Sequence, residues 1–395
     1  MAVGRQGRFG EALALARRAA HLAAGSPAAG SLPLQPKLFL GFALFDCDLV
    51  ADARAAYRDA LDDSFGSGWW LADTLMADAQ ACFVIGEWED AVPRLVAAGE
   101  AAQEKNHQLL LSQSLGLRIV IATATGDLPT ATALSDRVAA SLEGDDMSYN
   151  AGLLAFATAG TKVAVAGDLP GAYDLLLRSW QYDAACGNRF YHRWVAPDLV
   201  RVALALDHRA VAADVADTVA AGVALAPDVL SVRILALRCR GLVDNAVPPM
   251  MEAVSLARGL PLLLEHAGAC EDAATVLIRH GRRDDAAALL GEALERYEAA
   301  GADAWAGRAR ARLRALGVHP GTRGSGPRPA TGWDSLTATE RGVSLLVAEG
   351  LTNGAVARRM YISPHTVNTH LRHVFAKLAV SNRVGLARMV RQATE

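Results

Sequence analysis

The sequence predicts an all-α protein in which a superhelix of helical hairpins precedes a small four-helix domain. The chain has 395 residues, is rich in alanine, and contains 52% hydrophobic but only 6% aromatic residues. This composition favours closely packed helices, because alanine is the strongest helix former and is depleted in strands. A short motif recurs about every 40 residues, and a Gly- and Pro-rich segment then separates the repeats from a basic C-terminal part.

The repeated motif begins with Gly or Asp and carries an alanine five positions later, as in GDLPTA at residues 126–131. The alanines are Ala12, Ala53, Ala91, Ala131, Ala172, Ala212, Ala246 and Ala286. A fixed period near 40 indicates a repeat array, and each unit reads as a hairpin whose first helix ends at the Gly or Asp. Such hairpins bury their apolar faces by stacking. Residues 1–316 therefore resemble tetratricopeptide-type repeats.

The first motif begins at Gly7, so the helix that should precede it is missing. Either the array has an irregular first unit, or the chain corresponds to the C-terminal part of a longer ancestral protein.

Residues 317–332 read GVHPGTRGSGPRPATG, and this composition predicts a linker. The charge differs on its two sides, with −9 over residues 1–318 and +4 over residues 333–395. A basic module suits a polyanionic partner such as nucleic acid.

Residues 333–395 predict four helices, in which two joined by a short turn form a helix-turn-helix. Thr337 and Glu340 form a capping box for the first helix, which ends at Gly350, and Thr352 caps the second. Ser363 and the following proline begin the third helix, at about residues 365–378. Ser381 is expected to cap a fourth helix over about residues 382–392.

The third helix has two opposite faces. Its apolar stripe consists of Val367, Leu371, Val374 and Leu378, which we expect to face the domain core. The opposite face carries His365, Asn368, Thr369 and Arg372. Arg can read guanine and Asn adenine in the major groove, so we expect these four residues to contact bases. The alternative is an ordinary solvated helix face.

Residues 336–390 closely resemble the LuxR-type DNA-binding domain. The matching positions are Leu336, Thr337, Glu340, Gly350, Leu351, Thr352, Asn353, Val356, Ala357, Ser363, Thr366, Val367, His370, Lys377, Leu378 and Arg383. The resemblance implies that the third helix reads the major groove and that the fourth makes a dimer contact. It also implies DNA backbone contacts from Thr352, Thr366, His370, Lys377 and Arg383. The sequence departs from the family at Thr339, Gly354 and Ala379.

The order of repeats and C-terminal domain is similar to the C-terminal half of large ATP-binding LuxR-type regulators. The sequence contains no G-x-x-x-x-G-K-[ST] motif for a nucleotide phosphate cradle. It also contains no H-E-x-x-H, G-x-S-x-G or G-x-G-x-x-G motif, so we expect no enzyme activity and no cofactor. The acidic residues and His266 near Cys270 fit no standard metal-ligand spacing, and we expect no metal site.

Four other expectations follow. Five single cysteines suggest reduced thiols in helical cores. The longest uncharged run is 15 residues and no secretory signal is visible, so we expect a cytoplasmic, nucleoid-associated protein without a membrane partner.

An aromatic, basic cluster is formed by Arg189, Tyr191, His192 and Trp194. These residues either line a partner groove or, as their large rings favour, pack between repeats. Family members usually bind DNA as dimers.

The leading hypothesis is a sequence-specific bacterial transcription regulator that binds double-stranded DNA as a homodimer. Its repeats would bind an effector or a protein partner such as RNA polymerase. The alternative is an interaction scaffold in which the C-terminal domain provides only weak, non-specific DNA tethering.

Overall fold

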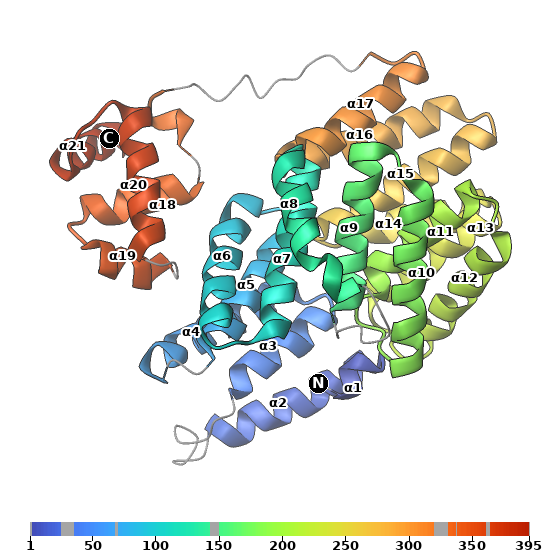
Figure 1. The fold of residues 1–395 in the computed structure, drawn as a ribbon, viewed down its shortest axis with the longest axis horizontal. Coiled ribbons are helices and arrows are strands. Elements are labelled where there is room, and N and C mark those ends of the chain that lie inside the picture. The colour runs from blue at the N-terminus through green and yellow to red at the C-terminus, as the bar shows by residue number, and fades with distance from the viewer. Residues whose placement is uncertain are drawn as a thin grey trace.

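The computed structural model describes residues 2–24, 35–67, 70–142, 150–319, 331–336, 338–360 and 364–394. These residues form helices and connecting turns, and no strand occurs among them (Figure 1). The predicted all-α class is confirmed. Within the same residues, no helix combines the length and the apolar character that a membrane span requires.

The repeat array is a series of antiparallel hairpins that follow one another along the chain (Figure 1). Its helices are α1 (Ala2–Arg5), α2 (Phe9–Ala24), α3 (Pro36–Asp46), α4 (Val50–Ser67), α5 (Leu71–Ile85), α6 (Trp88–Glu104), α7 (Gln108–Thr125), α8 (Leu128–Val138), α9 (Ala151–Ala166), α10 (Leu169–Cys186), α11 (His192–Ala205), α12 (Arg209–Val223), α13 (Leu230–Val243), α14 (Val247–Ala257), α15 (Leu263–Arg279), α16 (Arg283–Ala299) and α17 (Asp303–Ala315). A short 3-10 helix, η2 (Ala139–Leu142), follows α8.

The recurring motif forms the turn inside each hairpin. Its first residue has a positive φ in the turns that begin at Gly7, Asp48, Gly86, Gly126, Gly167, Asp207 and Gly281. In two units an aspartate caps the next helix, because the Asp127 and Asp168 side chains accept backbone N–H groups at 3.2 and 2.9 Å. The alanine five positions on is fully buried in six of the eight units. Its small side chain lets the two helices of a hairpin approach closely.

The seventh motif was placed wrongly from the sequence. Gly241 lies inside α13, and the turn residue is Asn245, with a φ of 49°. The buried position five residues on is then Met250, which is fully buried, rather than Ala246. The methionine fits because its side chain lies against Gly241, where a Cβ would stand 2.9 Å from Met250 Cε. With Met250 in register, the spacings on the two sides of the seventh unit become 38 and 36 residues instead of 34 and 40.

The C-terminal end of the array contacts the hairpins formed by α5 and α6 and by α7 and α8. α17 packs against α7, and α15 packs against α5. Trp305 of α17 meets Trp88 of α6 edge to face, with ring centroids 5.7 Å apart. The Gly86 turn lies so close to Ala300 and Leu263 that an added Cβ would be 3.2 Å from each. The superhelix therefore closes on itself instead of forming an open arc.

The cysteines have different environments. Cys82, Cys239 and Cys270 are buried, and burial raises the pKa of each thiol to about 12, so they stay protonated at neutral pH. Cys186 is exposed at the end of α10, contrary to the expectation of a core position.

The C-terminal part is a helical domain with a separate hydrophobic core. It comprises a 3-10 turn, η3 (Trp333–Ser335), followed by α18 (Ala338–Ala348), α19 (Asn353–Met360), α20 (Pro364–Leu378) and α21 (Arg383–Thr394). Its buried residues are Leu336, Val343, Val347, Val356, Ala357, Val367, Leu371, Val374, Leu378, Leu386 and Val390. The four predicted helices are confirmed, within two residues at each described end.

The boundaries of this domain differ slightly from the expected ones. Residues 320–330 of the predicted linker lie outside the described residues. Gly332 already belongs to the domain, because its N–H donates to the Lys377 carbonyl at 2.8 Å. The fourth helix is capped by Asn382 and not by Ser381, since Asn382 Oδ1 accepts the Gly385 N–H at 2.9 Å.

Candidate nucleic-acid interface

α19 and α20 form the helix-turn-helix. Thr352 caps α19 as predicted, since its hydroxyl oxygen accepts the Ala355 N–H at 3.2 Å. Val356 and Ala357 bury one face of this short helix. α20 begins at Pro364, where the missing N–H of proline costs nothing. The connecting residues 361–363, which include the predicted Ser363 cap, lie outside the described residues.

The apolar stripe of α20 fixes the orientation of the helix. Val367, Leu371, Val374 and Leu378 expose at most 6% of their surface, as the sequence predicted. The opposite face must then point away from the domain core.

On that outer face the structure exposes Asn368 and Arg372, which lie four residues apart and therefore on the same side of the helix. Thr369 is half-buried beside them. The side chain of His365 lies outside the described part of the structure. Arg372 forms no hydrogen bond with the described residues, so its guanidinium has all five N–H donors available for an outside acceptor.

The predicted backbone-contact residue His370 lies beside the outer face and is half-buried. Its Nε2 is buried and has no hydrogen-bond partner among the described residues. Burial lowers the pKa of His370, while Glu340 opposes this effect. The imidazole is therefore neutral at pH 7 and acts as a polar rather than a cationic group. The side chain of Thr366 lies outside the described part of the structure.

The other two predicted backbone contacts, Lys377 and Arg383, have partners inside the domain. Lys377 Nζ donates to Glu340 Oε2 at 2.7 Å. The Arg383 guanidinium donates to Asn353 Oδ1, at 2.5 Å, and to the Leu351 carbonyl. These contacts tie α20 to α18 and α21 to the start of α19. Sequence reasoning missed this positioning role, since it depends on which helices become neighbours.

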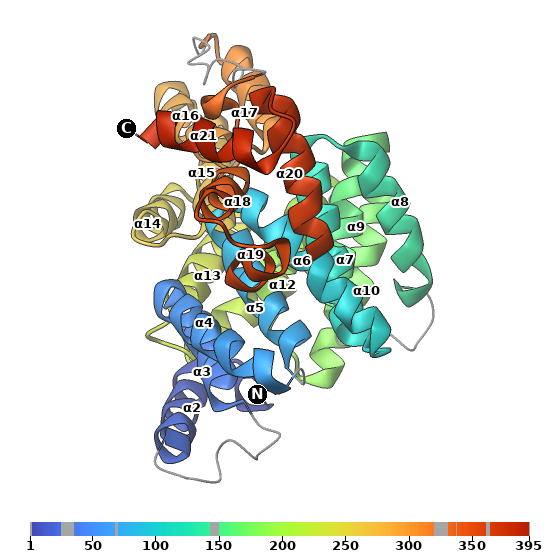
Figure 2. The ribbon, with the colours of Figure 1, turned by 90° about the vertical axis from the view of Figure 1, so that its left-hand side faces the viewer.

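The domain touches the repeat array through α18, which contacts α6. In the view of Figure 2 the domain lies in front of the array. Asp90 of α6 is among the charges near His370. Asn368 and Arg372 remain exposed in this arrangement. The contact with the array therefore leaves the outer face of α20 open.

The four residues expected either to line a groove or to pack between repeats are mostly in packed surroundings. Tyr191 is buried and donates its hydroxyl to Asn150 Oδ1 at 2.5 Å. The His192 ring lies tilted against Trp180, with ring centroids 4.3 Å apart, and Arg189 also lines the small pocket beside it. Trp194 alone among them lines the large cavity on the inner surface of the array.

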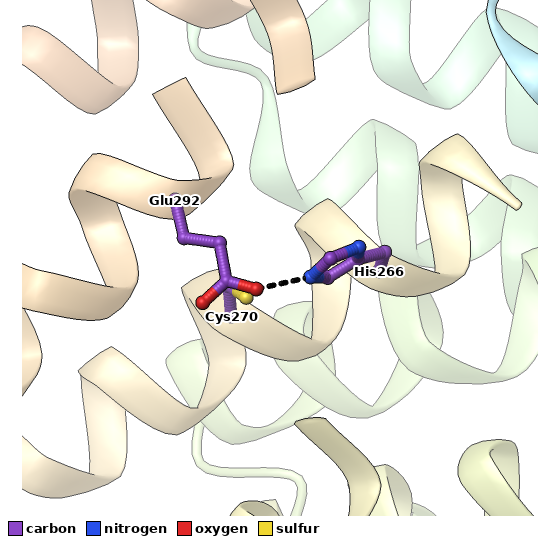
Figure 3. A group of neighbouring side chains, drawn as sticks. All are labelled: His266, Cys270 and Glu292. Carbon is purple, nitrogen blue, oxygen red and sulfur yellow. Dashed lines mark hydrogen bonds and ion pairs between the residues drawn. The ribbon is translucent and has the colours of Figure 1, made fainter. Parts of the chain in front are cut away.

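The structure also gathers His266, Cys270 and Glu292, whose ligand atoms lie within 4.8 Å of one another (Figure 3). His266 Nε2 and Glu292 Oε1 are 2.5 Å apart. Arg258, however, binds both oxygens of the same carboxylate, at 2.9 and 2.7 Å. The guanidinium supplies the positive charge that a metal would bring, so we interpret the group as a hydrogen-bonded ion cluster.

Comparison with known proteins identifies the C-terminal domain. Residues 334–390 match the family described as "Bacterial regulatory proteins, luxR family". An HTH-type transcriptional regulator of Mycobacterium bovis is 58% identical over 64 residues, which are 16% of this chain and 7% of that protein. A monoamine regulon transcriptional regulator of Klebsiella aerogenes is 51% identical over 51 residues, 13% of this chain and 22% of that protein.

A third relative is the nitrate/nitrite response regulator of Escherichia coli, which is 39% identical over 59 residues. These cover 15% of this chain and 27% of that protein. The chain thus spans less than a third of the length of each of these relatives.

Proposed function

Because residues 334–390 are a LuxR-type helix-turn-helix domain, we propose that the chain is a sequence-specific regulator of transcription that reads the major groove with α20. The exposed pair Asn368 and Arg372 on the outer face of α20 carries this proposal. Arg372 can bind the O6 and N7 acceptors of guanine, and Asn368 can bind adenine in the same way. His365 and Thr369 complete the proposed base-reading set.

The phosphate contacts come from the rim of this face. Thr352, Thr366, His370, Lys377 and Arg383 are the proposed backbone contacts. The net charge of +4 over residues 333–395 favours attachment to DNA, whereas the −9 of the preceding part opposes it. Lys377 and Arg383 would serve twice, in holding the domain together and in adding positive potential near the phosphates.

We propose that the protein binds DNA as a homodimer through α21. Val384 in the first turn of α21 exposes 72% of its surface, the highest value among the exposed large hydrophobic residues of the described chain. A twofold contact there would cover it. The two α20 helices would then read inverted half-sites about one helical turn apart, roughly 34–36 Å.

The repeat array would bind an effector or a protein partner, of which RNA polymerase is one candidate. A DNA-reading protein of this kind would act in the cytoplasm, at the nucleoid. No enzyme activity is part of this proposal.

In-vitro selection from random-sequence DNA tests the proposal. The full chain and an Asn368→Ala/Arg372→Ala double variant are selected in parallel at the same salt concentration. We expect an inverted-repeat consensus from the full chain and none from the double variant. Binding without a consensus, with equal salt dependence on all sequences, would instead support the scaffold alternative with weak, non-specific tethering.

A further inference from the structure

The inner surface of the repeat array contains a cavity of about 620 Å³. It is lined mainly by the first helices of successive hairpins, from α7 and α9 through α11, α13 and α15 to α17. α7 and α17, the first and last helices of this lining, contact each other. This volume lies within the range of sites that hold small organic molecules, about 300–1,000 Å³.

One wall of the cavity is apolar. α9 contributes Phe156, Val163 and four small residues, Ala157, Ala159, Gly160 and Ala164. Val163 leaves 38% of its surface uncovered, and a Cβ built on Gly160 would meet no atom within 4 Å. The wall therefore offers apolar surface that the array itself does not cover.

The facing wall is charged. Five arginines and four carboxylates line the cavity. Asp272 accepts hydrogen bonds from Arg201 at 2.7 Å and from Arg238 Nε at 3.0 Å. Glu271 accepts from Arg308, with a shortest contact of 2.7 Å, and from the Tyr297 hydroxyl at 2.8 Å. These bonds hold the guanidinium groups in fixed positions, and the lining contains one more arginine than carboxylate.

Two of these arginines face the open space. The side chains of Arg201 and Arg308 expose 39% and 52% of their surface, although both lie on the inner side of the array. Burial and the positive charge of Arg201 both act to lower the pKa of Arg308, and Glu271 outweighs them. An anion between the two guanidinium groups would reduce their mutual repulsion and would receive charge-assisted hydrogen bonds.

The cavity wall also contains polar atoms without partners. Trp194 and Glu265 each expose only 4% of their surface. Neither the indole N–H of Trp194 nor the carboxylate of Glu265 has a hydrogen-bond partner in the described part of the chain. Glu265 is compensated only in charge, by Arg193 Nε at 3.3 Å. Buried polar groups are normally bonded, so a donor and an acceptor that lack partners in one cavity indicate a polar ligand.

We propose that this cavity binds a small organic anion with an apolar body. The anionic group lies between Arg201 and Arg308, and the apolar body packs against α9. Trp194 donates to an acceptor of the ligand, and Glu265 accepts from a donor. This inference rests on the proposed function, because it names the chemical class of the effector that the repeats bind.

Fluorescence titration of the full chain with 8-anilinonaphthalene-1-sulfonate tests this inference. The probe combines an aromatic body with one sulfonate. Its uncharged counterpart, N-phenyl-1-naphthylamine, measures the contribution of the negative charge. We expect one saturable site for the sulfonate probe and a Kd about tenfold or more higher for the uncharged probe.

Two kinds of variant locate the site. Gly160→Leu fills the cavity from α9, and Gly10→Leu, at an exposed helical glycine with equal space, is its control. Arg308→Gln removes a guanidinium, and Arg310→Gln, which breaks the outer pair with Glu298, is its control. Val163→Phe is a second cavity-filling variant, and thermal unfolding shows that each variant is folded.

We expect Gly160→Leu, Val163→Phe and Arg308→Gln each to raise the Kd of the sulfonate probe by about tenfold or more, while both controls leave it unchanged. Absence of saturable binding, or binding that survives the folded cavity-filling variants, would overturn the cavity as the site. Equal affinity for the two probes would overturn the anion requirement. The titration contains no DNA, so these outcomes are separate from failure of the DNA selection.

Discussion

Lys377 near the end of α20 donates to Glu340 in the first turn of α18 at 2.7 Å, and Glu340 exposes only 4% of its side chain. The same carboxylate lies 4.0 Å from His373 Nδ1. The pair fixes α20 against α18 on the side of the domain that also carries the proposed phosphate contacts. A residue that the sequence places at the DNA backbone therefore has a defined structural role.

We expect Lys377→Met to destabilise the C-terminal domain by about 1–3 kcal/mol, because it leaves a buried carboxylate without its ammonium partner. Hydrogen exchange of the α18 amides in the full chain measures the loss. The double variant Glu340→Gln/Lys377→Met should recover part of it, and Arg388→Met, at an exposed position of α21, should have no effect. Equal exchange in Lys377→Met and the parent would contradict a structural pair.

Ala379 lies directly after α20, in the connection to α21, and its φ of 53° is in the left-handed region. Alanine pays a steric penalty there that glycine avoids. We expect Ala379→Gly to stabilise the domain by about 0.5–1 kcal/mol. Protection of the α20 and α21 amides from exchange reports the change. As a control, Ala376→Gly within α20 should destabilise it by about 1 kcal/mol, and a loss of protection in both variants would rule out strain at 379.

Arg372→Ala should weaken binding to the selected DNA site by about 1–3 kcal/mol and relax the preference at one base pair. The reason is the loss of a two-bond contact with one base. Competition binding on the consensus and on single-base variants measures both effects. Non-specific DNA is the internal control, and an equal loss on all sequences would show that Arg372 contacts phosphate instead.

The buried His192 makes stability depend on pH. Burial lowers its pKa to about 3, from 6.5 for the free side chain. Below pH 6.5 the unfolded chain therefore takes up a proton that the folded chain does not, and stability falls by up to about 1.4 kcal/mol per pH unit. His192→Phe, which keeps a ring against Trp180, should remove this loss.

Denaturant unfolding at pH 7 and pH 5 measures the effect as the difference between the parent and His192→Phe. Asp183 has the opposite effect on stability. Burial raises its pKa to about 7, so as the pH falls the folded state takes up a proton before the unfolded chain does, and stability rises. Its contribution is common to both proteins and cancels. His208→Phe, at an exposed ring that stacks on Tyr173, is the control. If the parent and His192→Phe lost the same stability between pH 7 and pH 5, His192 would titrate normally in the folded state.

Local patterns predicted most of the fold. The motif turns follow from Gly and Asp at helix ends, and the apolar stripe of α20 follows from its spacing. The seventh turn was misplaced because Asn245, which is neither Gly nor Asp, has the positive φ there. Gly241 gives room for the Met250 side chain and does not form a turn. The cap of α21 was misplaced by one residue because Ser381 and Asn382 are both good caps.

The sites needed distances that no local pattern contains. Asp272 is 34 and 71 residues from the two arginines that it binds, Arg238 and Arg201. Charged residues on otherwise alanine-rich helices were the available signal, and closure of the array decides that they face one cavity. The partners of Lys377 and Arg383 likewise come from other helices.

Closure of the array has a mechanical consequence. In an open solenoid each unit contacts only its neighbours, so terminal units can fray or be deleted one at a time. Here the Trp88–Trp305 contact joins units that are far apart along the chain. The last helix cannot detach without exposing the interior of an early hairpin. We therefore expect the units from α5 to α17 to unfold together and not one at a time.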